Sequence, residues 1–168
     1  WRDAEETLFE RMEGKVWGPS SGNAVREVKS VVGWASQRLR RGKSRAGKSL
    51  EHHLASVFNV SKIIFEDQVV TEEHKKPDFI FPDGESYHNL EFPAELLVSL
   101  AAKTTCKDRW RQVINEANRI GVKHLFTLQQ AISKNQLKEM KNENVKLVVP
   151  HKYINSFPSE YRGNILDL

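Results

Sequence analysis

The sequence predicts an α/β fold in which a mixed central β-sheet is flanked by helices. Three segments before residue 60 carry apolar side chains at helical spacing, whereas the apolar runs after residue 62 are short and strand-like. Three such runs follow one another, and the later ones alternate with helical segments. Successive strands can form an antiparallel meander, and strands separated by helices add in parallel, so both kinds of pairing are expected. The 168 residues suit a single domain spanning residues 1–168.

Helices are expected first along the chain. Residues 4–13 form the first, and residues 22–41 form the second. Ser49 can cap a third helix, whose apolar face consists of Leu50, Leu54, Val57 and Phe58. Between the second and third helices, the basic segment of about residues 38–48 is expected to be a loop.

Five strands and two further helices complete the expected fold. The first three strands cover residues 62–70, 78–81 and 95–102, and the last of these ends at Lys103. They are followed by a helix over residues 110–120, a strand over 123–128, a helix that Ser133 begins and a strand over 145–149.

The composition excludes several classes of protein. A single cysteine, Cys106, rules out an internal disulfide and a cysteine-rich zinc site, and the six histidines show no ligand spacing. No apolar run approaches the roughly 20 residues that span a bilayer, so no membrane association is expected. There is no secretory signal, and a cytoplasmic location is expected.

The charge of the chain is unevenly distributed. The formal net charge is +4, but six of the eleven residues from 38 to 48 are cationic and none is acidic. Such a segment suits a polyanionic partner, although it also fits a solvated surface loop.

Residues 42–49 match the phosphate-binding loop pattern G-x-x-x-x-G-K-[ST] in full. A nucleotide hydrolase is therefore an alternative function. That pattern needs a buried strand directly before it, and the preceding residues, 36–41, are too polar for one.

A second set of residues predicts a metal-dependent hydrolase. Asp78 begins one strand, Lys103 ends the next, and Glu116 lies on the following helix. Asp78 and Lys103 can converge at one end of the sheet, although a purely structural ion pair would look the same. Mg²⁺ takes one or two carboxylates and keeps several waters, and a lysine can stabilise charge on a phosphate. Together these are the parts needed to hydrolyse a phosphodiester bond.

The same region resembles a known family of nucleases. The matching stretches are KSRAGKSLEHHL, KKPDFIFP, LAAKTTCKDRWRQV, NEANRI, KHLFTLQQAIS and NQLKEM, which span roughly residues 40–140. They resemble the catalytic C-terminal domain of EcoRII-type restriction endonucleases, a variant of the PD-(D/E)xK nucleases. The standard acid two residues before the lysine is replaced by Ala101, and the variant moves that acid to the position of Glu116. The resemblance implies a restriction-endonuclease-like fold with its catalytic core at about residues 49–150.

The resemblance also implies roles for individual residues. Asp78, Lys103 and Glu116 correspond to the catalytic and metal-binding site. Glu51 corresponds to a further acidic residue near the metal, whereas position alone would make it a helix N-terminal carboxylate favoured by the dipole. Tyr87 corresponds to a tyrosine near the site, although it also fits an ordinary loop aromatic.

Residues that contact DNA are expected beside the catalytic ones. Lys107, Asp108 and Arg109 resemble the triplet with which this group reads adjacent C·G pairs, because Arg and Lys donate to guanine and Asp accepts from cytosine. The alternative is a solvated helix N-terminus. Lys43 and Arg45 are candidates for phosphate contacts.

The resemblance therefore implies a Mg²⁺-dependent type II restriction endonuclease, or its catalytic domain, of bacterial or archaeal origin. Its partner would be double-stranded DNA with a short CC/GG-containing site, CCWGG-like, and it would need no nucleotide cofactor. Cutting both strands favours a homodimer with two-fold symmetry. A DNA-binding module without catalysis remains an alternative, although every named acid and Lys103 are present.

Overall fold

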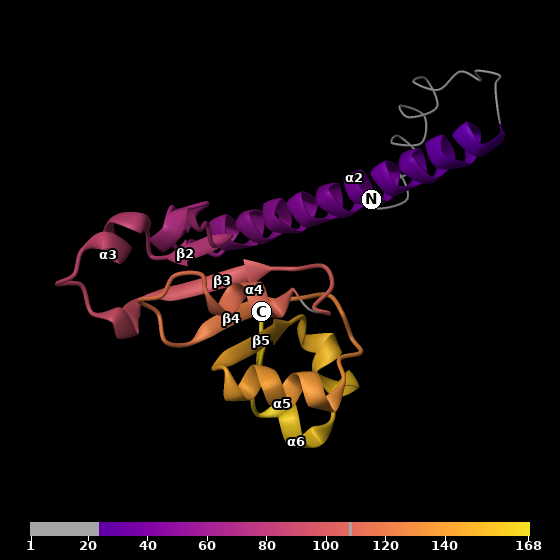
Figure 1. Ribbon diagram of the computed structural model, residues 1–168. Coiled ribbons are helices and arrows are strands. Elements are labelled where there is room, and N and C mark those ends of the chain that lie inside the picture. Colours follow the sequence, from indigo (N-terminus) through magenta and orange to yellow (C-terminus); the bar gives the residue numbers. More distant parts are fainter. Residues whose placement is uncertain (1–23, 108) are drawn as a thin grey trace. The chain divides into compact units, whose positions relative to one another are not determined.

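The computed structural model describes residues 24–107 and 109–168. The chain divides into two compact units, residues 1–41 and residues 42–168. The helix expected over residues 4–13 lies outside the described part. The second unit holds the sheet and every described candidate catalytic residue, and Figure 1 shows the elements in chain order.

The first described element is a single helix, α2 (Ala24–Val60), where the sequence predicts two helices separated by a loop. The prediction of a loop at residues 38–48 is therefore wrong. Most of that segment consists of Arg, Leu, Lys and Ala, which favour helix, and it contains no proline. Gly42 and Gly47 each cost about 1 kcal/mol relative to alanine in a helix interior, which does not break a helix of this length.

The helical backbone also rules out the phosphate-binding loop at residues 42–49. In a helix interior each N–H donates to the carbonyl four residues earlier, so these N–H groups cannot cradle a phosphate. The interpretation as a nucleotide hydrolase is therefore wrong for this segment.

In the described part the strands form one sheet of six, in the order in which they occur in the chain. They are β1 (Glu66–Asp67), β2 (Phe79–Phe81), β3 (Val98–Ala102), β4 (Lys123–Phe126), β5 (Val145–Val149) and β6 (Ile165–Asp167). Pairing is antiparallel from β1 to β3 and parallel from β3 to β6. The prediction of a mixed sheet is confirmed. β1 is far shorter than the expected 62–70, and β6 was not predicted.

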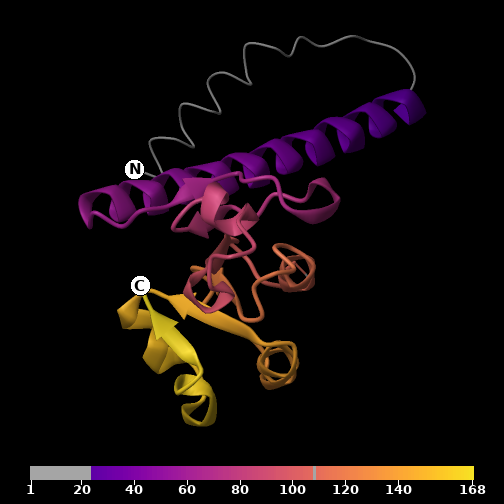
Figure 2. The same cartoon turned by 90° about the vertical axis from the view of Figure 1, so that its left-hand side faces the viewer.

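Alternating side chains of β3, β4 and β5 build two of the three core clusters, and the third contains Ile80 of β2 with Ala117 and Ile120. Leu100, Phe126 and Val148 point to the face covered by the C-terminal part of α2, where they meet its buried apolar side chains: Leu50, Leu54 and Phe58. Leu125 and Leu147 point to the opposite face, which α4 (Trp110–Ile114) and α5 (Lys134–Asn142) cover (Figure 2). The alternation follows from the two-residue period of a strand, and both faces of the sheet are buried.

The remaining elements are short. They are α3 (Gly84–His88), α6 (Ser159–Arg162) and three 3₁₀ helices, η1 (Glu72–His74), η2 (Ala94–Leu96) and η3 (His151–Ser156). The expected cap of α5 is confirmed, because the Ser133 hydroxyl accepts from the backbone N–H of Gln136. The helix expected over residues 110–120 ends at Ile114, so Glu116 lies in a turn and not on a helix.

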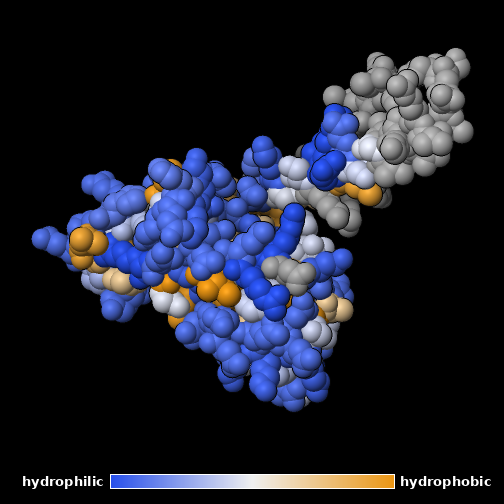
Figure 3. Space-filling model, viewed as in Figure 1, coloured by the Kyte–Doolittle hydropathy of each residue, from blue (hydrophilic) through white to orange (hydrophobic). Residues whose placement is uncertain are grey.

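The visible surface is mainly polar. The face of the molecule in Figure 3 is mostly hydrophilic, and its apolar spots are small and separated. Among the described helices, none is both long and apolar enough to cross a membrane.

Candidate active site

Asp78 and Lys103 meet at one end of the sheet. The Lys103 Nζ donates to Asp78 Oδ2 at 2.8 Å, and both side chains are largely buried, with exposed fractions of 17% for Lys103 and 10% for Asp78. The backbone N–H of Ala102 donates to the same oxygen at 2.7 Å. The convergence of these two strand-end residues follows directly from the antiparallel pairing of β2 with β3.

Neighbouring strands fix both partners in place. Phe79 pairs with Leu100 across β2 and β3, so the preceding Asp78 lies opposite the end of β3. The backbone N–H of Lys103 donates to the carbonyl of Phe126 in β4 at 2.9 Å. The Phe79 ring packs edge-on against Phe58 of α2. Asp78 and Lys103 are therefore held by three strands and a helix, a rigid support for a reactive site.

Two more acids share this environment. Burial raises the pKa of Glu116 to about 7, while the charge of Lys103 lowers it and that of Asp78 raises it. Burial also raises the pKa of Glu51 on α2, and the Asp78 charge adds to the increase while Lys103 opposes it. The structure thus brings Glu51, Asp78, Lys103 and Glu116 close enough for their charges to act on one another.

The balance of charge fits a cation. The charges of Asp78 and Lys103 act on both Glu51 and Glu116, and the like charge of Asp78 is one reason that the pKa values of these two acids are raised. The hydrogen bonds from Ala102 and Lys103 to the Asp78 carboxylate both end on Oδ2. No cluster of three or more His, Cys, Asp or Glu among the described residues could hold a metal by itself. Asp78 and Glu116 with water ligands match the donor set of Mg²⁺, which uses few protein oxygens.

Ala101 stands where the standard nuclease pattern has an acid. Its side chain is buried in the core cluster that includes Trp110 and Val113. With no carboxylate at that position of β3, the second acid near Asp78 comes from the turn that carries Glu116. The role of Glu116 as the relocated acid stays a prediction.

Tyr87 belongs to a different network. Its hydroxyl donates to both carboxylate oxygens of Glu72, at 2.6 and 2.7 Å, and its ring is buried. Burial and this hydrogen bond raise the pKa of Tyr87 far above its ordinary value. Its recorded partners are Glu72, the backbone of Arg119 and the ring of His88, not Asp78 or Lys103. The structure therefore does not bring Tyr87 into contact with the Asp78–Lys103 pair.

The candidate DNA-binding residues are only partly described. Lys107 and Arg109 are exposed on the link between β3 and α4, a few residues after Lys103. Asp108 lies outside the described residues, as does the side chain of Lys43. Arg45 is half-buried on α2.

Sequence reasoning missed three residues close to the site. Glu72 and Lys123 bind the turn that carries Glu116. Arg119 lies within that turn and fastens it to the carbonyls of α3 and of Phe92. The sequence held one signal for Lys123: a charged residue begins a strand in which Leu125 and Phe126 are buried. Glu72 and Arg119 lie on loops and carry no local pattern that distinguishes them from solvated charges.

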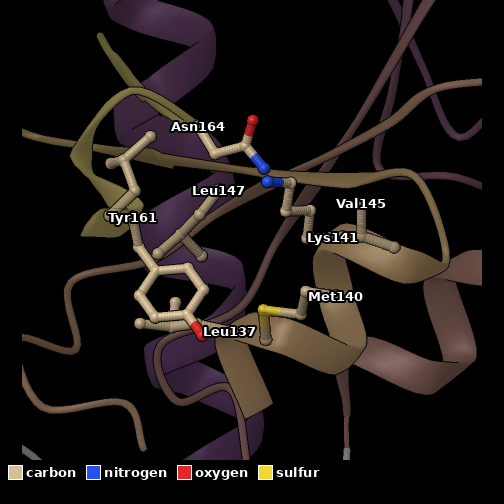
Figure 4. Close-up of a pocket in the computed structure, with 8 residues that line it drawn as sticks. Leu137, Met140, Lys141, Val145, Leu147, Tyr161 and Asn164 are labelled. Carbon is tan, nitrogen blue, oxygen red and sulfur yellow. The ribbon is translucent and has the colours of Figure 1, made fainter. Parts of the chain in front are cut away.

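A shallow pocket lies away from these residues. Leu137, Met140 and Lys141 of α5 line it together with side chains of β5, α6, β6 and the link between α6 and β6: Val145, Leu147, Tyr161, Asn164 and Ile165 (Figure 4). It contains none of the predicted site residues. Its mainly apolar lining makes it a packing defect between α5 and the C-terminal elements.

Comparison with known proteins agrees with the geometry. The family model "EcoRII C terminal" matches residues 8–168. The type II restriction enzyme EcoRII of Escherichia coli is 47% identical over 142 residues, which are 84% of this chain and 35% of that protein. The chain therefore spans about a third of the length of this relative.

Solved structures share the fold. A metal-depleted Ecl18kI in complex with uncleaved, modified DNA has a TM-score of 0.71 at 23% identity, covering 97% of this chain and 59% of that one. A PspGI restriction endonuclease–substrate DNA complex has a TM-score of 0.65 at 19% identity, covering 86% of this chain and 67% of that one. The fold is that of restriction endonucleases. Given a family match over nearly the whole chain and a relative at 47% identity, the chain belongs to the EcoRII C-terminal family.

Proposed function

We propose that this chain is the catalytic domain of a Mg²⁺-dependent type II restriction endonuclease that hydrolyses both strands of double-stranded DNA. The target is a short CC/GG-containing site, CCWGG-like. The observation that carries the proposal is the buried contact of Asp78 with Lys103, with the carboxylates of Glu116 and Glu51 in the same electrostatic environment. Family membership assigns that arrangement to DNA cleavage rather than to another hydrolysis.

The residues divide the work of hydrolysis. Mg²⁺, when bound, polarises the scissile phosphate and lowers the pKa of the attacking water. Asp78 and Glu116 would be the carboxylates that hold the metal, and Glu116 would have to be deprotonated to do so, which its raised pKa opposes. Oδ2 of Asp78 accepts from the backbone of Ala102 and from Lys103, which fixes the carboxylate in place. The Lys103 ammonium stabilises negative charge that develops on the phosphate.

The link between β3 and α4 is proposed to recognise the DNA sequence. Lys107 and Arg109 present exposed cationic side chains there, directly after Lys103. With Asp108 they would read adjacent C·G pairs through the major groove. Lys43 and Arg45 on α2 would contact phosphates, which adds affinity without sequence preference. A homodimer with two sites would cut both strands.

Cleavage of plasmid DNA and of a short CCWGG duplex tests this function. Discrete fragments are expected with Mg²⁺ alone, with no requirement for ATP. Lys103→Ala should lose cleavage by a factor of about 10²–10³, the cost of removing one group that stabilises transition-state charge. Lys152→Ala, which removes an exposed lysine of η3, is the matched control and should cut normally.

Several outcomes would contradict the proposal. Smeared products or no cutting at any Mg²⁺ concentration would reject a site-specific nuclease. Sequence-specific binding without cutting would support the DNA-binding module instead. Sedimentation of the chain with a cognate duplex tests the homodimer, and a complex with one copy of the chain per duplex would contradict it.

A further inference from the structure

Lys123 is a buried lysine. It has no role in the hydrolysis or the DNA recognition proposed above. It begins β4 and is only 5% exposed. Its Nζ donates to the backbone carbonyls of Ala117 and Ile120, the second at 2.5 Å. Both carbonyls belong to residues 115–120, the turn after α4 that carries Glu116; we call this segment the Glu116 turn.

The Glu116 turn has a conformation that needs external support. α4 ends at Ile114, and the N–H of Glu116 donates to the Val113 carbonyl at 3.1 Å. Ala117 then adopts a φ of 50°, the left-handed region that residues with a Cβ rarely enter. The carbonyl of this strained residue accepts from the N–H of Ile120 at 2.9 Å and, in addition, from the Lys123 ammonium.

Other contacts hold different residues of the same turn. The Glu72 carboxylate accepts from the N–H of Asn118 at 3.1 Å, and the Arg119 guanidinium donates to the carbonyls of Ser86, Tyr87 and Phe92. These contacts fasten Asn118 and Arg119 to η1, α3 and the loop before η2. Lys123 alone among them binds the residue next to Glu116.

The charge of Lys123 indicates a role beyond holding the backbone of the Glu116 turn. A buried ammonium group costs free energy that a neutral donor would avoid. Burial lowers the pKa of Lys123, while the charges of Glu72 and Glu116 raise it. Its positive charge therefore acts on the acid whose turn it holds.

We propose that Lys123 is a positioning residue for the endonuclease site: its buried ammonium group fixes the Glu116 turn so that the Glu116 carboxylate faces Asp78 and Lys103. This inference rests on the proposed Mg²⁺-dependent cleavage. Lys123 would act through its contacts with the turn rather than as a metal ligand. Because the turn would already be ordered before the metal binds, Lys123 would strengthen metal binding in the way that outer residues orient metal ligands.

Lys123→Met tests the inference, because Met has a similar length and removes the ammonium group that donates to the carbonyls of Ala117 and Ile120. The half-saturating Mg²⁺ concentration for cleavage should rise about tenfold, the lower end of the effect of losing an outer residue of a metal site. The cleavage rate at saturating Mg²⁺ should stay near that of the wild type, since bound metal restores the position of Glu116. Affinity for a cognate duplex in EDTA should be unchanged.

A readout without cleavage accompanies the kinetics. The affinity of the chain for a cognate duplex is measured in Ca²⁺ and in EDTA, and the gain that Ca²⁺ provides should shrink in Lys123→Met. Leu137→Ala, a core change in α5, is the control: it should lower the melting temperature without changing the half-saturating Mg²⁺ concentration. Lys123→Gln keeps one neutral donor and should give an intermediate Mg²⁺ dependence even if the Met variant fails to fold.

The outcomes separate this inference from the proposed function. A wild-type chain that cuts with Mg²⁺, beside Lys123 variants with unchanged Mg²⁺ dependence, would overturn the inference and leave the function intact. A rate reduced equally at every Mg²⁺ concentration would also overturn it, because that result indicates a smaller folded fraction. A wild-type chain that never cuts would overturn the proposed function and the inference with it.

Discussion

Glu116→Gln should make the metal-free chain more stable while it abolishes cleavage. The Glu116 carboxyl is buried beside the carboxylates of the site, and this burial raises its pKa to about 7 from an ordinary 4.5. Gln has the same shape and no charge, so the variant no longer has to bury a carboxylate. It also loses a proposed metal ligand, and therefore activity.

The size of the effect follows from that gap in pKa. Between pH 4.5 and 7 the folded chain binds this proton more tightly than the unfolded chain, so the free energy of unfolding decreases as the pH rises. At about 1.4 kcal/mol per pH unit, the wild type loses about 3 kcal/mol across this window. Below pH 4.5 Glu116 is protonated in both states, and above pH 7 the loss is complete. Glu116→Gln should lack this slope and be about 3 kcal/mol more stable at pH 8.

Urea unfolding in EDTA at pH 5 and pH 8 measures both quantities. Glu160→Gln on α6 changes an exposed glutamate and should follow the wild-type curve at both pH values. Added Mg²⁺ should stabilise the wild type, because a ligand that binds only the folded state adds to stability. It should stabilise Glu116→Gln much less.

Two results would refute this reasoning. If Glu116→Gln is less stable than the wild type at pH 8, the carboxylate makes favourable contacts that outweigh its burial. If the variant keeps the wild-type slope between pH 5 and pH 8, another group accounts for the pH dependence.

Three further predictions address binding, recognition and the core. Asp78→Ala should abolish cleavage and keep specific binding of a cognate duplex in EDTA, and loss of binding in a gel-shift assay would show that Asp78 also contacts or orders the DNA interface. Arg109→Ala should weaken binding to the cognate site by about 1–3 kcal/mol while binding to unrelated DNA changes little, and equal losses on both would assign Arg109 to a phosphate. Leu125→Ala, at a fully buried position of β4, should lower the free energy of unfolding by about 2–5 kcal/mol, and urea unfolding that shows less than 1 kcal/mol would contradict the placement of Leu125 in the core.

Most of the fold could be read from local pattern. The apolar run at residues 145–149 became β5 without change, and the cap at Ser133 began α5. The mixed pairing also followed from the order of the elements. The predicted loop at residues 38–48 was wrong because most of the segment consists of Arg, Lys, Leu and Ala, whose helix propensity outweighs the cost of Gly42 and Gly47. β6 was missed because it has three residues and one buried side chain, which is too short to show the alternation of apolar and polar residues typical of a strand.

For the site, the sequence by itself determined that an acid begins β2 and a lysine follows β3, and antiparallel pairing then required the two to meet. The family resemblance pointed to Glu116 but not to its conformation. Only the tertiary structure shows that α4 ends at Ile114 and that Glu116 lies within electrostatic reach of Asp78 and Lys103. The physical reason is that Glu72 binds the N–H of Asn118 and the Arg119 guanidinium binds the carbonyls of Ser86 and Phe92, contacts made only when the sheet and its surrounding loops assemble. Local periodicity across residues 110–120 favours a continuous helix, and these non-local contacts, together with the nearby Lys123 ammonium, override it.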